Sequence, residues 1–483
     1  MRLYREISLS LLIPVLFSPV TNRNKANSGI SGKRPVNILF LFSDDQRFNT
    51  IHELGNNGII TPNLDNLVRT GTTFTRAYIM GGSQGAVSVP SRAMLMTGKY
   101  LYNLERTGSF IPENHIMLGE YLQKYGYDVY GTGKWHNGFA SSARNFSSGG
   151  NLFFGGMSDQ FNVLVWNFDP SGKYQKDSTM NQPHINKNKN ATELFSDDAV
   201  KYLENNKGEK PFFLYVAFTS PHDPRVMPPE FLDMYNTSKI SLPENFLPQH
   251  PFDNGELKIR DELLAGFPRT NAEIRIHIRD YYAMITHLDA EIGRILDALR
   301  NSGQYNNTVI IFAGDNGLAL GQHGLMGKQN VYEHSVHIPL IFCGPDIPED
   351  QRVPAFCYLT DIFPTLCEML GFEIPSTVEG ISLFTCINKR RRIVREHLYF
   401  AYRDYQRAVR DERYKLIEYN VNGIRNTQLF DLKADPWETT NIATKLKYGK
   451  KIEHLRQVML EQKKLTGDNS PFWNGMEFSA NRK

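Results

Sequence analysis

Two polar pairs in the sequence carry side chains that could bind a cation. Asp44 and Asp45 follow one apolar, strand-like run, and Asp315 and Asn316 follow another. Carboxylates that are brought close together repel one another, and a hard divalent cation with oxygen ligands relieves this repulsion. In the alternative interpretation, each pair only caps a helix that follows the strand. The occurrence of two such pairs at strand ends favours the cation.

The elements that would position these pairs are strands that alternate with helices. Apolar runs of strand length occupy residues 36–42, 211–218 and 309–313, and apolar residues recur at helical spacing over residues 281–299. This order predicts an α/β fold with a large, mostly parallel central sheet sandwiched by helices. Neighbouring loops converge at the carboxyl ends of the strands in such a sheet, and we expect the functional residues there.

The pattern changes near residue 398 to short alternating or aromatic runs that are separated by polar turns. These runs are residues 398–402, 408–410, 414–419 and 428–430. We expect them to form a smaller antiparallel sheet, packed by a helix near residues 452–464. The predicted organisation is a signal peptide and polar linker (1–33), a catalytic domain (34–390) and a small α+β subdomain (391–483).

The first residues have the pattern of a secretory signal peptide. Arg2 and Arg5 precede an apolar stretch at residues 7–20, and residues 21–33 are polar. The stretch is shorter than the roughly 18 to 20 residues of a membrane span, and no later stretch reaches that length. We therefore predict an exported protein without a transmembrane segment, periplasmic or secreted in a bacterium.

Composition narrows the class of protein. The chain has 483 residues, of which 41% are hydrophobic and 22% are charged, as expected for a globular protein with a sizeable core. The formal net charge of +3 gives no indication of a nucleic-acid partner. The four cysteines lack the spacing of a zinc site, and both a disulfide and buried thiols remain open for them. They are Cys343, Cys357, Cys367 and Cys386.

Further short motifs occur in a fixed order with the two acidic pairs. They are Ser88-Val89-Pro90-Ser91-Arg92 with Thr97-Gly98, Gly131-Thr132-Gly133-Lys134-Trp135-His136, Ser220-Pro221-His222, and Gly324-Leu325-Met326-Gly327-Lys328. Together they resemble the type I sulfatases of the alkaline phosphatase superfamily, whose signature is Cys or Ser, any residue, Pro, Ser, Arg, with Thr-Gly downstream. The resemblance extends to Leu429-Phe430-Asp431 and Asp435-Pro436-Trp437-Glu438.

The resemblance implies that Ser88 is the nucleophile after its oxidation to formylglycine (3-oxoalanine). One hydroxyl of the hydrated aldehyde would attack sulfur, and the other would allow the resulting formylglycine-sulfate intermediate to collapse. Arg92 would steady this hydrated group. Because the position holds serine and not cysteine, a serine-type radical maturase is implied as a partner.

The resemblance also implies one Ca²⁺ per chain, although oxygen ligands would suit magnesium as well. The implied ligands are Asp44, Asp45, Ser88 in its modified form, Asp315 and Asn316. Lys134 and Lys328 would contact the sulfate oxygens. His222 would protonate the leaving alcohol and His136 would act as the base, because both roles need a group that titrates near neutral pH.

The expected substrate is a sulfated carbohydrate of a mucin, a glycosaminoglycan or an algal polysaccharide, attacked at its end. Aromatic residues, 12% of the chain, could stack on sugar faces. Residues in nearby loops either contact this substrate or form surface ion pairs. They are Arg47, Asp223, Arg225, Glu333 and His334.

Two alternatives remain at this stage. A phosphate or phosphonate ester hydrolase of the same superfamily would share the fold, but Lys328 stands where such enzymes are expected to have a ligand for a second metal. A non-catalytic protein that binds sulfated glycans would not need both histidines and the maturation motif.

Overall fold

The central sheet has eight strands in the order β13-β2-β12-β10-β1-β9-β5-β6. The computed structural model describes residues 35–174, 183–187, 189–389 and 393–475, so the predicted signal peptide and linker lie outside the described residues. The strands are β1 (Asn37–Ser43), β2 (Gly71–Phe74), β5 (Asp128–Lys134), β6 (Ser148–Phe153), β9 (Phe212–Ala217), β10 (Thr308–Gly314), β12 (Leu340–Cys343) and β13 (Gln351–Val353). Strand β1 runs parallel to β9 and β10, whereas β12 runs antiparallel to β10 and β2. The prediction of a mostly parallel sheet is confirmed.

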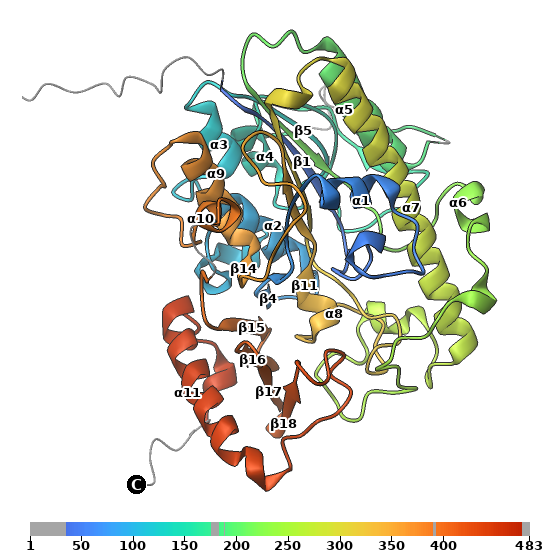
Figure 1. Ribbon diagram of the computed structural model, residues 1–483, viewed down its shortest axis with the longest axis vertical. Coiled ribbons are helices and arrows are strands. Elements are labelled where there is room, and N and C mark those ends of the chain that lie inside the picture. Colours follow the sequence, from blue (N-terminus) through green and yellow to red (C-terminus); the bar gives the residue numbers. More distant parts are fainter. Residues whose placement is uncertain (1–34, 175–182, 188, 390–392, 476–483) are drawn as a thin grey trace, which may run out of the picture. The chain divides into compact units, whose positions relative to one another are not determined.

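Helices cover both faces of this sheet (Figure 1). Leu39 and Leu41 of β1 belong to the core formed with α1 (Pro62–Arg69), α5 (Ala191–Asn205) and α7 (Asn271–Asn301). Ile38, Phe40 and Phe42 belong to the core on the opposite face, formed with α2 (Ser88–Thr97), α3 (Leu118–Gln123) and α9 (Ile362–Leu370). Successive side chains of a strand point to opposite faces, so burial on both sides accounts for the unbroken apolar run.

A second sheet contains the four strands expected near the end of the chain. They are β15 (Leu398–Tyr402), β16 (Gln406–Arg410), β17 (Tyr414–Val421) and β18 (Ile424–Asp431), all antiparallel to their neighbours in this series. Helix α11 (Gly449–Thr466) packs on them. The two-residue strand β4 (Gly81–Gly82) adds to β15 in parallel. The antiparallel sheet and its helix are as predicted, but β4 is not among the predicted strands.

The cysteines lie in the core. Cys343, Cys357 and Cys367 are buried free thiols, and Cys386 is also buried. Burial raises the pKa of Cys343 to about 12, so this thiol stays protonated at neutral pH. For the first three cysteines, the structure therefore selects the buried thiol of the two alternatives.

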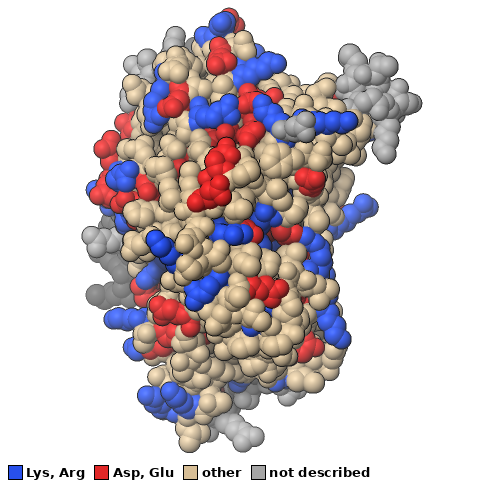
Figure 2. Space-filling view, turned by 90° about the vertical axis from the view of Figure 1, so that its right-hand side faces the viewer, with Lys and Arg blue, Asp and Glu red and all other residues tan. Residues whose placement is uncertain are grey.

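The surface carries charges of both signs. In Figure 2, Lys and Arg side chains are interspersed with Asp and Glu over the face that is shown. Among the described residues, no helix combines the length and the apolar character that a membrane span requires.

Candidate active site

The loops that follow β1 and β10 meet at the carboxyl edge of the central sheet. The backbone N–H of Asp315 donates to the carbonyl oxygen of Ser43 at 3.1 Å, and that of Asp45 donates to Asp315 Oδ1 at 2.9 Å. Asp45 has a φ of +64°, in the left-handed region that Asp tolerates better than most residues. The structure thus brings both acidic pairs of the sequence to one place.

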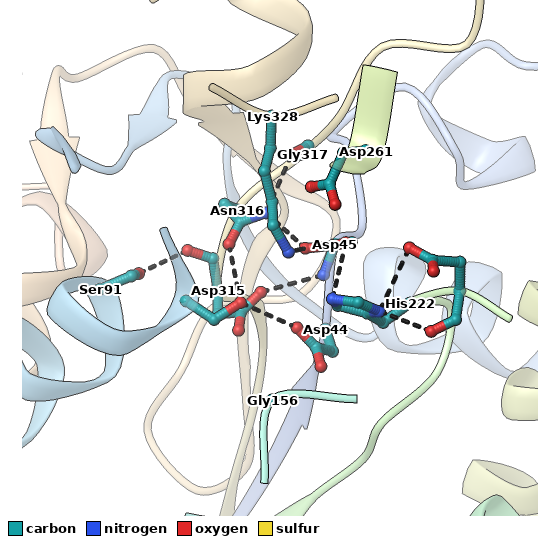
Figure 3. A network of polar contacts seen from close by, with 12 residues as sticks. Asp44, Asp45, Ser91, Gly156, His222, Asp261, Asp315, Asn316, Gly317 and Lys328 are labelled. Atoms are coloured by element: carbon teal, nitrogen blue, oxygen red, sulfur yellow. Dashed lines mark hydrogen bonds and ion pairs between the residues drawn. The ribbon is translucent and has the colours of Figure 1, made fainter. Parts of the chain in front are cut away.

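Three carboxylates form a cluster in the interior of the protein (Figure 3). Oxygens of Asp44, Asp45 and Asp315 lie within 4.8 Å of one another, and all three residues are buried. Asn316 Nδ2 donates to Asp45 Oδ1 at 2.6 Å. Burial and the charge of Asp44 raise the pKa of Asp315 to about 7, because a third negative charge is unfavourable here. Three buried carboxylates and the amide oxygen of Asn316 are the kind of oxygen ligands that fit a hard divalent cation such as Ca²⁺.

Two lysines reach the same cluster from different loops. Lys134, at the end of β5, places Nζ 2.6 Å from Asp44 Oδ2 and 2.7 Å from the carbonyl oxygen of Gly156. Lys328 places Nζ 2.6 Å from Asp45 Oδ1. Burial alone would raise the pKa of Asp44, but neighbouring positive charges, Lys134 foremost, hold it well below its usual range. The site therefore contains fixed charge of both signs.

Ser88 is the first residue of α2 and is 1% exposed. Its Oγ lies 3.1 Å from Asp44 Oδ1 and 3.2 Å from Asn316 Oδ1. Arg92 follows four residues later, one helical turn along the same face of α2. Its Nε donates to Asp315 Oδ2 at 2.9 Å. One helix thus supplies both a hydroxyl and a guanidinium to the carboxylate cluster.

Two histidines complete the polar groups of the site. His222 Nδ1 lies 2.7 Å from the carbonyl oxygen of Asp223, which can only accept, so Nε2 is left facing Asp45 Oδ2 at 3.7 Å. Burial lowers the pKa of His222 to about 4 and places that of His136 well below its usual value. The expectation that both titrate near neutral pH does not hold in the cation-free protein, because neither ring is solvated enough to stabilise its charged form.

A cavity of about 370 Å³ opens over these groups. Its lining includes five predicted residues: Ser88, Lys134, His136, His222 and Lys328. This cavity, referred to below as the active-site cavity, therefore combines the Ser88 hydroxyl, two ammonium groups and two imidazoles. Such an arrangement can bind an anionic ester and exchange protons with it.

Comparison with known proteins identifies the family. Residues 36–372 match the family model described as Sulfatase, which covers well over half of the chain. The chain belongs to the sulfatase family. It is therefore a sulfuric ester hydrolase with the α/β fold of that family. Residues 321–465 of this sulfatase also match the model described as N-sulphoglucosamine sulphohydrolase, C-terminal.

Relatives of this sulfatase include named bacterial enzymes. It is 28% identical to an N-acetylglucosamine-6-O-sulfatase of Bacteroides thetaiotaomicron, over 91% of this chain and 88% of the relative. It is 30% identical to a sulfatase of Formosa agariphila, over 88% of this chain and 86% of the relative. A solved structure of a protein in complex with its substrate D-glucosamine-2-N,6-O-disulfate has a TM-score of 0.77 and 26% identity, with 91% of this chain and 99% of the other covered.

Four further polar residues of the sulfatase line the active-site cavity without having been predicted from the sequence. They are Arg260, Asp261, Gln329 and Arg403. Arg260 and Asp261 belong to the long connection between β9 and α7, and Arg403 follows β15 in the second sheet. Only Gln329 could have been found from the sequence, because it directly follows Lys328, the last residue of a motif. The other three come from segments that carry no motif, and only the tertiary fold brings them here.

The five predicted substrate contacts do not line the described part of the active-site cavity. Asp223 is nearest, because it forms an ion pair with Arg260 at the mouth of the cavity. The guanidinium of Arg225 lies over the Tyr281 ring, 5.8 Å from its centroid. The remaining three line a different cavity, and they are Arg47, Glu333 and His334. Contact of these five residues with substrate stays a prediction.

Proposed function

We propose that this sulfatase removes an O-sulfate group from a terminal sugar of a sulfated glycan, with Ca²⁺ and a formylglycine formed from Ser88. The observation that carries the proposal is the active-site cavity, of about 370 Å³, with Ser88 at its base beside Lys134 and Lys328. A cavity of this size suits one sugar ring better than a long chain. The N-acetylglucosamine-6-O-sulfatase and the disulfated glucosamine complex among its relatives support an amino sugar as the substrate.

The cation would be held by Asp44, Asp45, Asp315 and Asn316, whose oxygens converge in the interior. When bound, Ca²⁺ would polarise the sulfate and favour an ionised nucleophile. The formylglycine at position 88 would supply a hydrated aldehyde with two hydroxyl groups, and a serine-type maturase would be required to make it.

The two lysines would bind the nonbridging oxygens of the sulfate. Lys134 and Lys328 are held by Asp44 and Asp45, so their ammonium groups need no reorganisation when negative charge develops. Arg92, held by Asp315, would fix the start of α2 and thereby the position of the nucleophile.

The two histidines would move protons. His222 presents Nε2 to the cavity, and the negative charge of a bound sulfate ester would raise its pKa from about 4 toward the range in which it can protonate the leaving alcohol. The Nδ1 atom of His136 has no hydrogen-bond partner among the described residues, and it would accept the proton that leaves the nucleophile. His222 would then act in its protonated form and His136 in its neutral form within the same reaction.

Export and domain organisation are also part of the proposal. The signal-peptide pattern of residues 1–33 would direct the chain to the periplasm or to the medium of a bacterium. Residues 34–390 would form the catalytic domain, and residues 391–483 would form a subdomain that contributes Arg403 to the mouth of the active-site cavity.

The test is an activity assay with protein that has been co-expressed with a serine-type maturase. A panel of sulfated mono- and disaccharides is incubated with the enzyme, and both sulfate and desulfated sugar are measured. We expect release from one position of one sugar, loss of release in Ser88→Ala, and normal release in Ser196→Ala, a buried helix serine in α5.

Two outcomes would contradict the proposal. The absence of release, with conversion of Ser88 verified by mass spectrometry, would point to a sulfate ester that is not a sugar or to a phosphate ester. On a sulfated polymer, release from internal residues before any release from chain ends would contradict exo-action.

A further inference from the structure

A second cavity, of about 530 Å³, lies apart from the active-site cavity and shares no lining residue with it. It lies between the loop after β1, helix α8 (Glu333–Val336) and the segment that follows β18. Its volume is in the usual range for small-molecule sites. Because the two cavities share no lining residue, the ligand of the second cavity is inferred from its own residues.

The inner wall of the second cavity contains polar groups that lack partners. Arg47 is 3% exposed, yet its Nε and Nη1 have no hydrogen-bond partner among the described residues. Neither ring nitrogen of His334 has a partner in the same set of residues. An unpaired buried charge is costly, so these groups would be stabilised by an anion with several acceptor oxygens.

The anion is expected at Arg47 because two other arginines of the second cavity already have carboxylate partners. Arg410 Nη1 lies 3.0 Å from Glu333 Oε2, and Arg76 Nη1 lies 2.7 Å from Glu412 Oε2. No ion pair of Arg47 occurs within the described part of the chain. Its guanidinium lies over the ring of Tyr281 at 5.2 Å, a contact that leaves the edge of the fork available.

The other walls of the second cavity are aromatic. The rings of Phe48 and His337 stack at 4.2 Å with an angle of 9°, and His337 stacks on Tyr78 at 4.6 Å with an angle of 17°. Trp437 also lines the cavity with 36% of its surface exposed, and its carbonyl oxygen accepts from Asn245 Nδ2 at 2.6 Å. A wide indole with one accessible side suits the apolar face of a sugar ring.

We propose that the second cavity is a binding site for an acidic sugar, distinct from the active-site cavity. Arg47 and His334 would bind the carboxylate or sulfate group of this sugar, and Trp437 would pack against its ring. The proposal does not depend on the reaction at Ser88.

The test uses protein with unmodified Ser88, so that no turnover occurs, and methyl glucuronoside as the probe. Binding is followed by calorimetry and by tryptophan fluorescence. Methyl glucoside is the uncharged control, and inorganic sulfate is the control anion without a ring. We expect one site for the uronoside, binding that is about tenfold weaker or more in Arg47→Met and in Trp437→Ala, and unchanged binding in Arg300→Met, an exposed arginine of α7.

His222→Gln distinguishes the two cavities, because His222 lines only the active-site cavity. Uronoside binding that survives in this variant and is lost in Trp437→Ala supports the proposal. The partly exposed Trp437 keeps the test decisive if Arg47→Met fails to fold. Four results would each overturn the proposal. The first is loss of uronoside binding in His222→Gln, and the second is an uncharged glucoside that binds as tightly as the uronoside. The third is sulfate alone that binds as tightly while Trp437→Ala has no effect, and the fourth is no binding of the uronoside.

Discussion

Replacement of Asp315 by asparagine should stabilise the protein when no cation is present. The pKa of Asp315 is about 7 in the folded chain and 3.8 in the unfolded chain. The ionised form is therefore roughly 4 kcal/mol less favourable in the folded chain than in the unfolded chain. Asparagine keeps an oxygen for the N–H of Asp45, and the raised pKa already includes the attraction between Arg92 and the ionised carboxylate. In chelator at pH 8, we therefore expect Asp315→Asn to be more stable than wild type by a few kcal/mol, at most about 4 kcal/mol.

The pH dependence of this difference follows from the direction of the shift. The pKa is raised on folding, so the folded wild type binds the proton more tightly than the unfolded chain does. The contribution of Asp315 to the stability of wild type is thus lost as the pH rises from 3.8 to about 7, and the variant lacks this contribution. The advantage of the variant should grow across this window and remain constant above it.

Urea unfolding at several pH values, with chelator and with Ca²⁺, provides the assay. At a Ca²⁺ concentration 100 times its Kd, wild type should gain about 2.7 kcal/mol, and Asp315→Asn should gain less. Asp468→Asn is the matched control. Burial would raise the pKa of Asp468, but Arg407 lowers it to about 2, so this variant should lose about 3–5 kcal/mol with or without Ca²⁺.

The reasoning would be refuted if Asp315→Asn were less stable than wild type in chelator at pH 8. Equal stabilisation of wild type and variant by Ca²⁺ would show that the ion binds elsewhere.

Three further predictions concern catalysis, acid stability and backbone geometry. His222→Gln should lower kcat for sugar sulfates by about 10²–10⁴-fold but should lower kcat for aryl sulfates less, because phenols leave without a proton. Equal losses of kcat for the two kinds of substrate would contradict a role of His222 as the acid. Burial lowers the pKa of His287 to about 4, so this group should contribute a loss of roughly 3 kcal/mol as the pH falls from 6.5 to 4; in urea unfolding, His287→Leu should lose that much less than wild type, whereas the exposed-site control His454→Leu should lose as much as wild type. Parallel pH profiles of all three proteins would count against this. Gly133 has a φ of +86°, and an added Cβ would lie 1.9 Å from the carbonyl oxygen of Ala217, so Gly133→Ala should cost about 3 kcal/mol or more, and an unchanged melting temperature would disprove the clash.

The parts of the fold that were predictable are those in which the local pattern determines the structure. The run that contains β1 is apolar throughout because both faces of the strand are buried, and the polar pair after it marks where the strand ends. The strand at Leu398–Tyr402 was predicted with the bounds that it has. In contrast, β4 contains two glycines with no alternating pattern, and it becomes a strand only because β15 lies beside it.

Prediction of the site was limited in the same way. Asp44 and Lys328 belong to motifs and were found, whereas Arg260 and Arg403 reach the cavity from segments without a motif. The ionisation of His222 was not predictable, because its pKa depends on burial and on charges that only the fold brings near.

The pairing of β4 with β15 has a consequence for the order in which the protein can mature. Gly81 and Ala401 come from distant parts of the chain, and β4 lies only a few residues before Ser88. During synthesis, the segment that contains Ser88 therefore emerges long before the strand that pairs with β4. Contacts of such high sequence separation form late in folding, so the interval before β15 appears is the period in which Ser88 is still accessible to another enzyme.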